Sequence, residues 1–238
     1  MLELILERLK AFDGADWLIR ETKTRRLESY NIKKQSEMLR DVETAGYNLV
    51  VYVPHSEDGK EYCGSSSTEI HPGMTPDEVR VKVATSIVTA NYVKNETFPL
   101  VEPSAAGARI TAKTETDAFQ ALEDLQAAFY SGDCHDGGHI SYSEFFITRN
   151  EERILNSRGV DVSFTTYTVF TETAVHWKGK LEQEHEKEIE ILESFQTSLP
   201  VVLPSDTSAA CAMLKDRVAQ LFSVAERKSA ARPTPRRY

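Results

Sequence analysis

Apolar residues recur every three or four positions in four segments of the chain, and this spacing predicts four helices. The first covers residues 2–12 and ends at Asp13-Gly14. The second has the strongest start signal, because Thr75 is followed by a proline and, three residues on, by Glu78. We predict that it runs to about Lys94. Its apolar positions are Val79, Val83, Ile87 and Ala90, with Ala84 and Val88 beside them.

The third and fourth predicted helices lie in the second half of the chain. The third follows Thr116 and ends at Ser131-Gly132. The fourth is predicted to begin at a cap formed by Ser205 or Asp206. The predicted buried positions are Phe119, Leu122, Leu125 and Phe129 in the third helix, and Cys211, Leu214, Val218, Leu221, Phe222 and Ala225 in the fourth.

The segments between the helices alternate apolar and polar residues, which is typical of β-strands. Residues 17–54 are predicted to form three strands, and Asp58-Gly59 is predicted to reverse the chain into a fourth over 61–66. Residues 140–147 and 160–175 predict two more strands, while 99–107 are expected to connect elements. Residues 180–196 fit a helix or a strand, and the alternation of Ile189, Ile191 and Phe195 favours a strand from Lys187.

The element order is helix, several strands, two helices, several strands and a last helix. This order predicts an α+β fold, with helices packed on a largely antiparallel or mixed β-sheet. The chain has 238 residues, of which 40% are hydrophobic, so it can bury a core. We expect one domain over residues 1–230, and a basic, proline-containing tail or the start of an interdomain linker over 231–238.

The amino-acid composition indicates which kinds of partner and which cellular location to expect. A formal net charge of −9, from 37 acidic and 28 basic residues, argues against nucleic acid. No apolar run approaches the roughly 20 residues of a membrane-spanning helix, and the charged residues among 1–12 do not fit a signal peptide. Cys63, Cys134 and Cys211 are widely spaced and suggest neither a disulfide framework nor a zinc ribbon. We therefore expect a cytoplasmic protein.

One short segment is a candidate metal site. Cys134, His135, Asp136 and His139 fall within six residues, and all four side chains can bind metal. The alternative is a surface turn before a strand. Two histidines four residues apart share a ligand site readily on a helix, but Gly137-Gly138 between them favours a flexible loop.

Other candidate motifs are weaker. His185-Glu186 begins like a zincin motif, but Ile189 stands where the second histidine is required. The chain has no nucleophile elbow, Walker A loop or dinucleotide-binding glycine motif. No catalytic, cofactor-binding or metal residue is therefore assigned. Two charged segments are interpreted as solvated: the acidic run Glu182, Glu184, Glu186, Glu188 and Glu190, and the basic end Arg227, Lys228, Arg232, Arg236 and Arg237.

Several segments, in chain order, resemble the N-terminal half of TldD/PmbA proteins, the family that includes modulators of DNA gyrase and TldD-related metallopeptidases. The most telling is Asn156-Ser157-Arg158-Gly159, in which Asn and Gly suit a tight turn between two β-rich runs. The other segments lie within residues 17–40, 50–53, 64–66, 70–78, 90–95, 143–146, 154–161 and 231–235.

The resemblance implies an N-terminal α/β domain, followed in the family by a β-rich domain, in dimers around an enclosed chamber. In active members a His-Glu-x-x-x-His helix and a later cysteine hold zinc, and the enzyme cuts unfolded peptides or peptide precursors. This chain is expected to stop where the linker to that second domain would begin. It has no match to those ligands, so we expect no zinc and no peptidase activity from it alone.

Three functions remain open from the sequence. The chain is expected to be a non-catalytic N-terminal domain of a TldD/PmbA-type, metallopeptidase-related protein, contributing dimer contacts and substrate enclosure. Alternatively, it is a binding or regulatory module that pairs with a full-length relative, or an enzyme using Cys134, His135 and His139. Expected partners are a second copy or a TldD/PmbA paralogue, and a peptide through the complete protein. Residues 160–170 and 206–225 are the expected contact surfaces.

Overall fold

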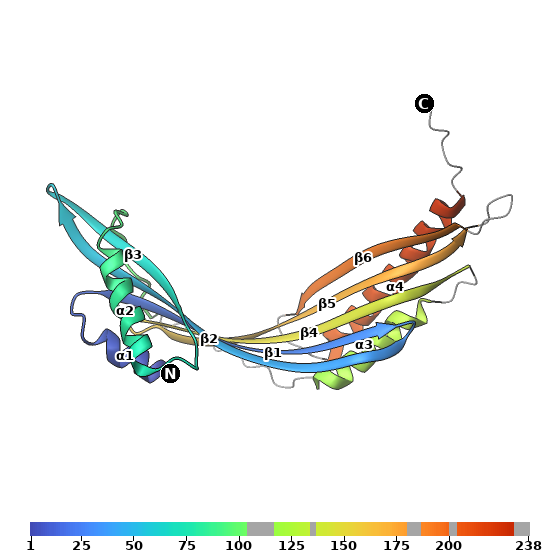
Figure 1. Ribbon diagram of the computed structural model, residues 1–238, viewed down its shortest axis with the longest axis horizontal. Helices are drawn as coiled ribbons and strands as arrows, with labels where there is room; N and C mark the ends of the chain where they lie inside the picture. Colours follow the sequence, from blue (N-terminus) through green and yellow to red (C-terminus); the bar gives the residue numbers. More distant parts are fainter. Residues whose placement is uncertain (104–116, 134–136, 180–186, 200–203, 231–238) are drawn as a thin grey trace, which may run out of the picture. The chain divides into compact units, whose positions relative to one another are not determined.

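The computed structural model describes residues 1–103, 117–133, 137–179, 187–199 and 204–230 (Figure 1). Six strands form one sheet in the order β3-β2-β1-β4-β5-β6. The fold is α+β, with helices packed on an antiparallel sheet, which confirms the predicted class. The elements are α1 (Leu2–Leu9), β1 (Asp16–Ile32), β2 (Gln35–Glu57), β3 (Lys60–Ile70), α2 (Pro76–Ala90), α3 (Ala118–Ser131), β4 (Gly138–Asn156), β5 (Asp161–Gly179), β6 (Lys187–Leu199) and α4 (Pro204–Ala230).

Neighbouring strands run in opposite directions. β2 pairs with β3, and β5 with β6, in antiparallel registers without a break. Between β1 and β4, the Ser157 amide donates to the Trp17 carbonyl, and the Lys33 amide donates to the Ser141 carbonyl. Because the partner's number falls as the number in β1 rises, this central pair is antiparallel as well.

The prediction of three strands within residues 17–54 is wrong. Those residues belong to two strands, β1 and β2, joined at Lys33 and Lys34, whose φ angles are 47° and 68°. Positive φ at both positions suits a two-residue hairpin turn that matches the twist of the strands. The error arose in residues 35–41, which are exposed and lack the apolar alternation by which a strand is recognised.

The chain divides into two compact units. Unit 1 comprises residues 1–24, 43–111 and 150–165, and unit 2 comprises 25–42, 112–149 and 166–238, each described only as far as the structure extends. The strands β1, β2, β4 and β5 each contribute residues to both units. The prediction of one domain over residues 1–230 stays a prediction.

In unit 1, α1 and α2 cover one face of the strands. Ile19, Leu49, Val51 and Ile70 supply the strand side of this core. Val79, Val83, Ile87 and Ala90 are buried as predicted for α2, whereas Ala84 is only partly buried and Val88 is 57% exposed. The helix ends at Ala90 rather than near Lys94. The helix side of the core consists of Ile5, Leu9, Val79, Val83, Ile87 and Ala90.

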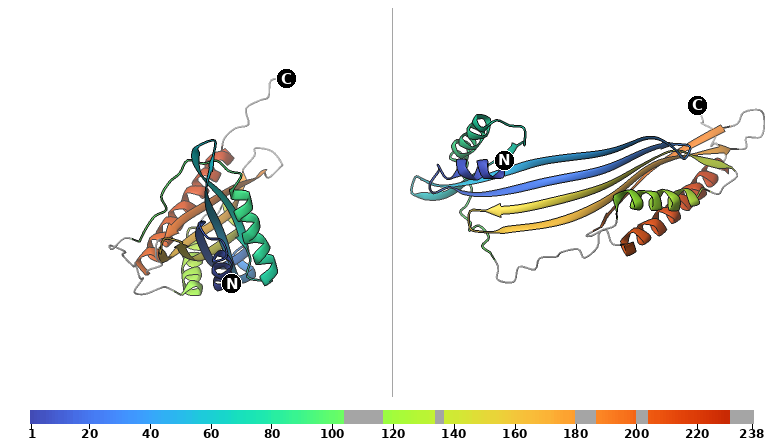
Figure 2. Two further views of the ribbon diagram at one scale, coloured as in Figure 1. Left: turned by 90° about the vertical axis from the view of Figure 1, so that its left-hand side faces the viewer. Right: turned by 90° about the horizontal axis from the view of Figure 1, so that it is seen from below.

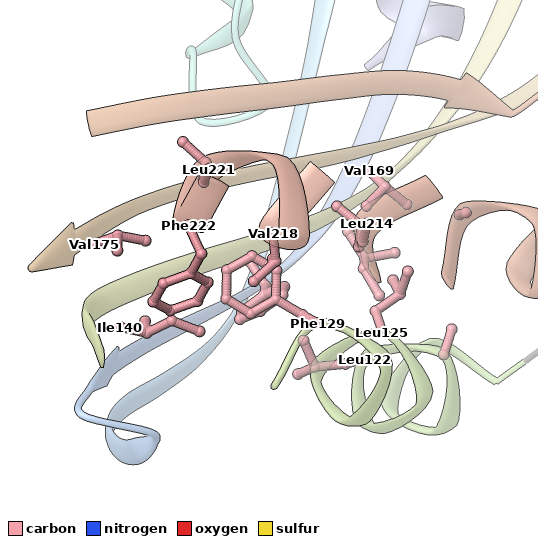
Figure 3. Packing of buried hydrophobic residues seen from close by; sticks show 14 of the residues in the cluster. Leu122, Leu125, Phe129, Ile140, Val169, Val175, Leu214, Val218, Leu221 and Phe222 are labelled. Atoms are coloured by element: carbon pink, nitrogen blue, oxygen red, sulfur yellow. The ribbon is translucent and has the colours of Figure 1, made fainter. Parts of the chain in front are cut away.

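In unit 2, α3 and α4 pack together on one face of the strands (Figures 2 and 3). Phe119 was predicted to be buried but is 41% exposed, and Ala121 is buried instead. Cys211 is only partly buried, and Ala210 takes the buried position. The shared core contains Leu122, Leu125, Phe129, Leu214, Val218 and Phe222.

The starts of the last two helices differ in their chemistry. Asp117 caps α3, because its Oδ1 accepts the amides of Phe119 and Gln120 at 2.9 and 3.1 Å. The cap predicted for α4 at Ser205 or Asp206 is wrong, since that helix begins at Pro204 and both residues lie inside it. Proline suits a first helical position because it has no amide hydrogen to satisfy there. The prediction of a strand from Lys187 is confirmed.

The predicted capping box at the start of α2 is confirmed and gives a direct stability test. Thr75 Oγ1 accepts the Glu78 amide at 3.3 Å, and the Glu78 carboxylate accepts the Thr75 amide at 2.7 Å. Thr75→Ala should cost about 1 kcal/mol of unfolding free energy in urea, because one helical amide loses its partner. Thr75→Ser, which keeps the hydroxyl, is the control. Equal stability of the two variants would contradict a role for the cap.

A second prediction concerns the contact between α2 and β3. A Cβ atom on Gly64 would overlap the Ala90 carbonyl oxygen and lie 2.7 Å from that of Val93. Gly64→Ala should therefore destabilise the chain by about 2 kcal/mol in thermal or urea unfolding, since backbone must shift to admit the methyl group. Gly46→Ala is the matched control, because a Cβ there meets no atom within 4 Å. A Gly64→Ala variant as stable as the control would exclude this close packing.

Candidate functional site

The structure describes only part of the segment that was a candidate metal site. Cys134, His135 and Asp136 lie outside the described residues. The second residue of β4 is His139, and its ring stands 5.5 Å from that of His176 on β5. Among the residues that the structure describes, no three His, Cys, Asp or Glu side chains lie close enough to hold a metal ion.

The two glycines in that segment have a packing role. A Cβ on Gly137 would lie 2.7 Å from Cζ2 of Trp177, and one on Gly138 would lie 2.6 Å from Cε3 of the same ring. Gly138 begins β4, as expected of a turn before a strand. The sequence interpretation of a flexible loop missed this contact, because Trp177 is distant in the chain.

The remaining candidates give no site in the described part of the chain. His185 and Glu186 lie outside it, as do Glu182, Glu184 and residues 231–238. The backbones of Glu188 and Glu190 belong to β6 and pair with Lys178 and His176. No helix that the structure describes is long and apolar enough to cross a membrane.

The turn at residues 156–159, which most resembles the TldD/PmbA sequences, joins β4 to β5. Several hydrogen bonds hold it. Asn156 Oδ1 accepts the amides of Arg158 and Val160 at 3.0 Å, and its Nδ2 donates to the Val101 carbonyl at 2.7 Å. Gly159 has a φ of 92°, a conformation that favours glycine. The predicted tight turn is confirmed. It also holds the start of β1, since Ser157 and Arg158 both donate to Asp16 at 2.6 Å.

In unit 2, the strand face opposite to the helices carries a buried carboxylate. Ser29 points toward α3, where Gln126 donates to its hydroxyl at 2.9 Å, so the neighbouring Glu28 points to the other face. Glu28 is 2% exposed, accepts a hydrogen bond from Arg40 Nε at 2.7 Å and forms an ion pair with Arg26 Nε at 2.8 Å. Burial raises the pKa of Glu28, but the hydrogen bond and charge of Arg40, with the charge of Arg26, hold this pKa below its ordinary value.

Aromatic rings continue this face across three adjacent strands. Tyr30 on β1 packs edge-to-face on Phe146 of β4 at 5.6 Å, and Phe146 contacts Phe170 of β5 at 5.6 Å. Burial and the negative charge of Glu172 raise the pKa of Glu144, which lies on the same face as Phe146. The open face of unit 2, defined by Glu28, Tyr30, Glu144, Phe146 and Phe170, therefore combines an aromatic row with carboxylates.

The helix side of the same strands holds a polar network that sequence reasoning missed. Asn31 Nδ2 donates to the Ser143 carbonyl at 3.3 Å, and the Ser143 hydroxyl lies 2.7 Å from the Tyr130 hydroxyl. These contacts join β1, β4 and α3 beneath the helix. Because the polar atoms satisfy one another, the network anchors α3 rather than offering a site to a ligand. Its only sequence signal is a set of polar residues at inward strand positions.

In unit 1, a groove of about 750 Å³ runs between β3 and α2. The β3 side presents Ser66, Ser67 and Thr68, while α2 contributes hydroxyl, charged and small apolar side chains. This volume is within the range of ligand-binding clefts, about 300–1,000 Å³. The helix side and the approach to it comprise Met74, Asp77, Glu78, Val81, Lys82, Thr85, Ser86 and Thr89.

The fold can be compared with solved structures. A proposed modulator of a DNA gyrase from Thermotoga maritima matches 99% of this chain with a TM-score of 0.60 and 15% identity. TldE from Thermococcus kodakarensis matches 92% with a TM-score of 0.55 and 14% identity. A proposed modulator of DNA gyrase from Bacteroides thetaiotaomicron matches 91% with a TM-score of 0.54 and 17% identity.

These matches define the class of fold. The chain has the fold of one half of TldD/PmbA-like proteins, as the resemblance implied, and it spans 50%, 47% and 49% of the three neighbouring chains. No known family model matches the sequence, and no curated protein matches it significantly. At identities of 14–17% the likeness is one of fold.

The paired carboxylate of Glu28 gives a test with a defined pH dependence. Since its pKa is lowered in the folded state, the stability it contributes is full above pH 4.5 and is lost as the pH falls through the lowered pKa. The difference in unfolding free energy between the parent chain and Glu28→Gln should therefore be largest near neutral pH and shrink below pH 4.5. Urea unfolding at several pH values measures it.

The exposed Glu37, also on a strand, provides the control as Glu37→Gln. Its difference from the parent chain should be smaller at neutral pH. A Glu28→Gln difference that stays constant from neutral to acidic pH would contradict the role assigned to the ion pairs.

Proposed function

We propose that this chain acts as the non-catalytic, N-terminal-type half of a TldD/PmbA-like, metallopeptidase-related protein. The proposed role is to enclose an unfolded peptide or peptide precursor and to supply contacts between subunits. The main observation in support of this proposal is that 99% of the chain superposes on only 50% of a neighbouring chain. The fold of a larger protein is thus present here as one of its halves.

The open face of unit 2 supports a role in enclosure. Helices α3 and α4 bury the other face of these strands, so Tyr30, Phe146 and Phe170 are left half-buried in the described chain. Aromatic rings beside carboxylates can hold an extended peptide through apolar contacts and through its amide or basic groups. Arg26 and Arg40 keep Glu28 charged on this face.

In this proposal, residues outside this chain carry out catalysis. The described residues do not form a three-ligand metal site, and the sequence has no zincin motif. When bound in a complete protein of this type, zinc would supply the hydrolytic chemistry. This chain would bind and orient the peptide and exclude water around it. Pairing with a full-length relative remains the alternative arrangement for the same surfaces.

Of the two surfaces expected to make contacts, one is favoured by the structure. Val162 and Phe164 on β5 are 49% and 40% exposed, as the prediction for residues 160–170 requires. The prediction for residues 206–225 has no such support, because the apolar positions predicted in α4 are buried or partly buried against α3 and the strands of unit 2. We therefore propose that Val162 and Phe164 form the subunit contact.

The test is the mass of the purified chain. We expect a homodimer or larger species by light scattering at micromolar concentration, because association removes the two exposed side chains from water. The double substitution Val162→Lys and Phe164→Lys should shift the mass to that of a monomer. Val88→Lys, at another exposed valine, is the control. A parent chain that is monomeric at every concentration and binds no hydrophobic dye would contradict the proposed contact.

A further inference from the structure

The groove between β3 and α2 lies beside an edge of the sheet. β3 is the first strand in the sheet order, so one side of it pairs with β2 and the other has no strand beside it in the described chain. Strand edges attract other extended chains, because each presents a row of unpaired amides and carbonyls. The chemistry of this groove therefore depends on which β3 groups point outward.

The register identifies those groups. Cys63 lies opposite Pro54, which has no amide hydrogen, and the Cys63 amide instead donates outward to the Asn95 carbonyl at 3.0 Å. Outward groups recur at every second residue of a regular antiparallel strand. Because the β2–β3 register has no break, the amides and carbonyls of Ser67 and Glu69 also point outward. Ser67 is one of the residues that line the groove.

The chain already adds one segment of its own to this edge. The Asn95 carbonyl accepts the Cys63 amide, and its side chain donates to the Ser65 hydroxyl at 3.1 Å. The stretch from Ser66 to Ile70 continues the same edge without a described partner beyond β2. Five extended residues span about 17 Å. The α2 residues from Asp77 to Thr89 cover a similar length, about 18 Å.

The edge lacks the usual protections against pairing. Exposed edges in proteins are commonly blocked by lysine, proline or a bulge. From Ser66 to Ile70 the sequence is Ser-Ser-Thr-Glu-Ile, with no lysine and no proline, and the register shows no bulge. Small hydroxyl side chains leave room for a second backbone to approach. On the facing helix, Val81 is 52% exposed and lines the groove.

We propose that this groove binds an extended polypeptide segment, which adds to β3 as a further strand beside Ser67 and Glu69. Alternate side chains of the segment would point to α2, where Val81, Thr85 and Thr89 suit small β-branched residues such as valine and threonine. The backbone bonds supply affinity without requiring a particular sequence, as in other cases of strand addition. The proposal does not depend on the function of the open face of unit 2 or on dimerisation.

The first experiment measures binding of a fluorescein-labelled heptapeptide, KTVTVTK, to the full chain by fluorescence anisotropy. Saturable binding is expected. Two further peptides carry N-methyl groups: one on its valine amides, and the other on its threonine amides. Because only one set of amides can face β3, one methylated peptide should lose binding and the other should keep it. No saturable binding of the parent peptide, or equal binding of all three peptides, would overturn the proposal.

Protein variants locate the site. Ser67→Pro removes the outward amide but no bond to β2, a substitution that edge strands tolerate. It should weaken binding about tenfold, the effect of losing roughly one hydrogen bond and its alignment. Val81→Lys should also weaken binding, whereas Val88→Lys should not, since only Val81 lines the groove. Circular dichroism checks that each variant folds.

The remaining outcome is self-pairing of β3 between two copies. Light scattering at the concentration of the binding assay tests for it. A Ser67→Pro variant that is monomeric where the parent chain is dimeric would show that a second copy occupies the edge, and it would overturn the peptide assignment. Loss of dimerisation in the Val162→Lys and Phe164→Lys variant with peptide binding intact would leave this proposal standing and confine the effect to the subunit contact.

Discussion

Each helix pair covers one face of the strands beneath it, and this one-sided coverage determines the roles of the strand residues. Successive side chains in a strand point to opposite faces of the sheet. The residues before and after one that is buried by a helix therefore point to the face opposite the helices. In unit 2, Leu27 and Ser29 face the helices, and Glu28 between them faces away. The same alternation separates the structural core from the surfaces available to other molecules.

On the open face of unit 2, electrostatics and packing act together. Glu28 is almost fully buried, yet two arginines keep its pKa low. A buried carboxylate without such partners would be costly to ionise. Next to it, the Tyr30 ring lies beneath the Arg40 guanidinium, and its contact with Phe146 extends the surface to the neighbouring strand.

In unit 1 the important constraint is the close contact of α2 with β3. Gly64 allows the end of the helix to meet the strand, and the chain then returns along the strand edge to Asn95. The helix therefore lies beside the edge instead of covering it completely. The groove follows from this arrangement, since its strand side is the outward row of β3 and its helix side begins at the capped end near Thr75.

The amino-acid sequence by itself determined the elements with strong local signals. Thr75 and Glu78 predicted the start of α2, because a capping box is made by residues three positions apart. The turn at Asn156 was predicted for the same reason, since its bonds to Arg158 and Val160 are local. The fold class followed from the order of the elements and agreed with the resemblance.

Only the tertiary structure decided which polar residues meet and which surfaces stay open. The pairing of Glu28 with Arg40 and the approach of Ala90 to Gly64 join residues that no local pattern relates. Likewise, the polar part of β2 carried no periodic signal, because neither of its faces is buried there. Local interactions can be inferred from spacing along the chain, whereas the sheet edge, the groove and the uncovered face depend on the register of distant strands.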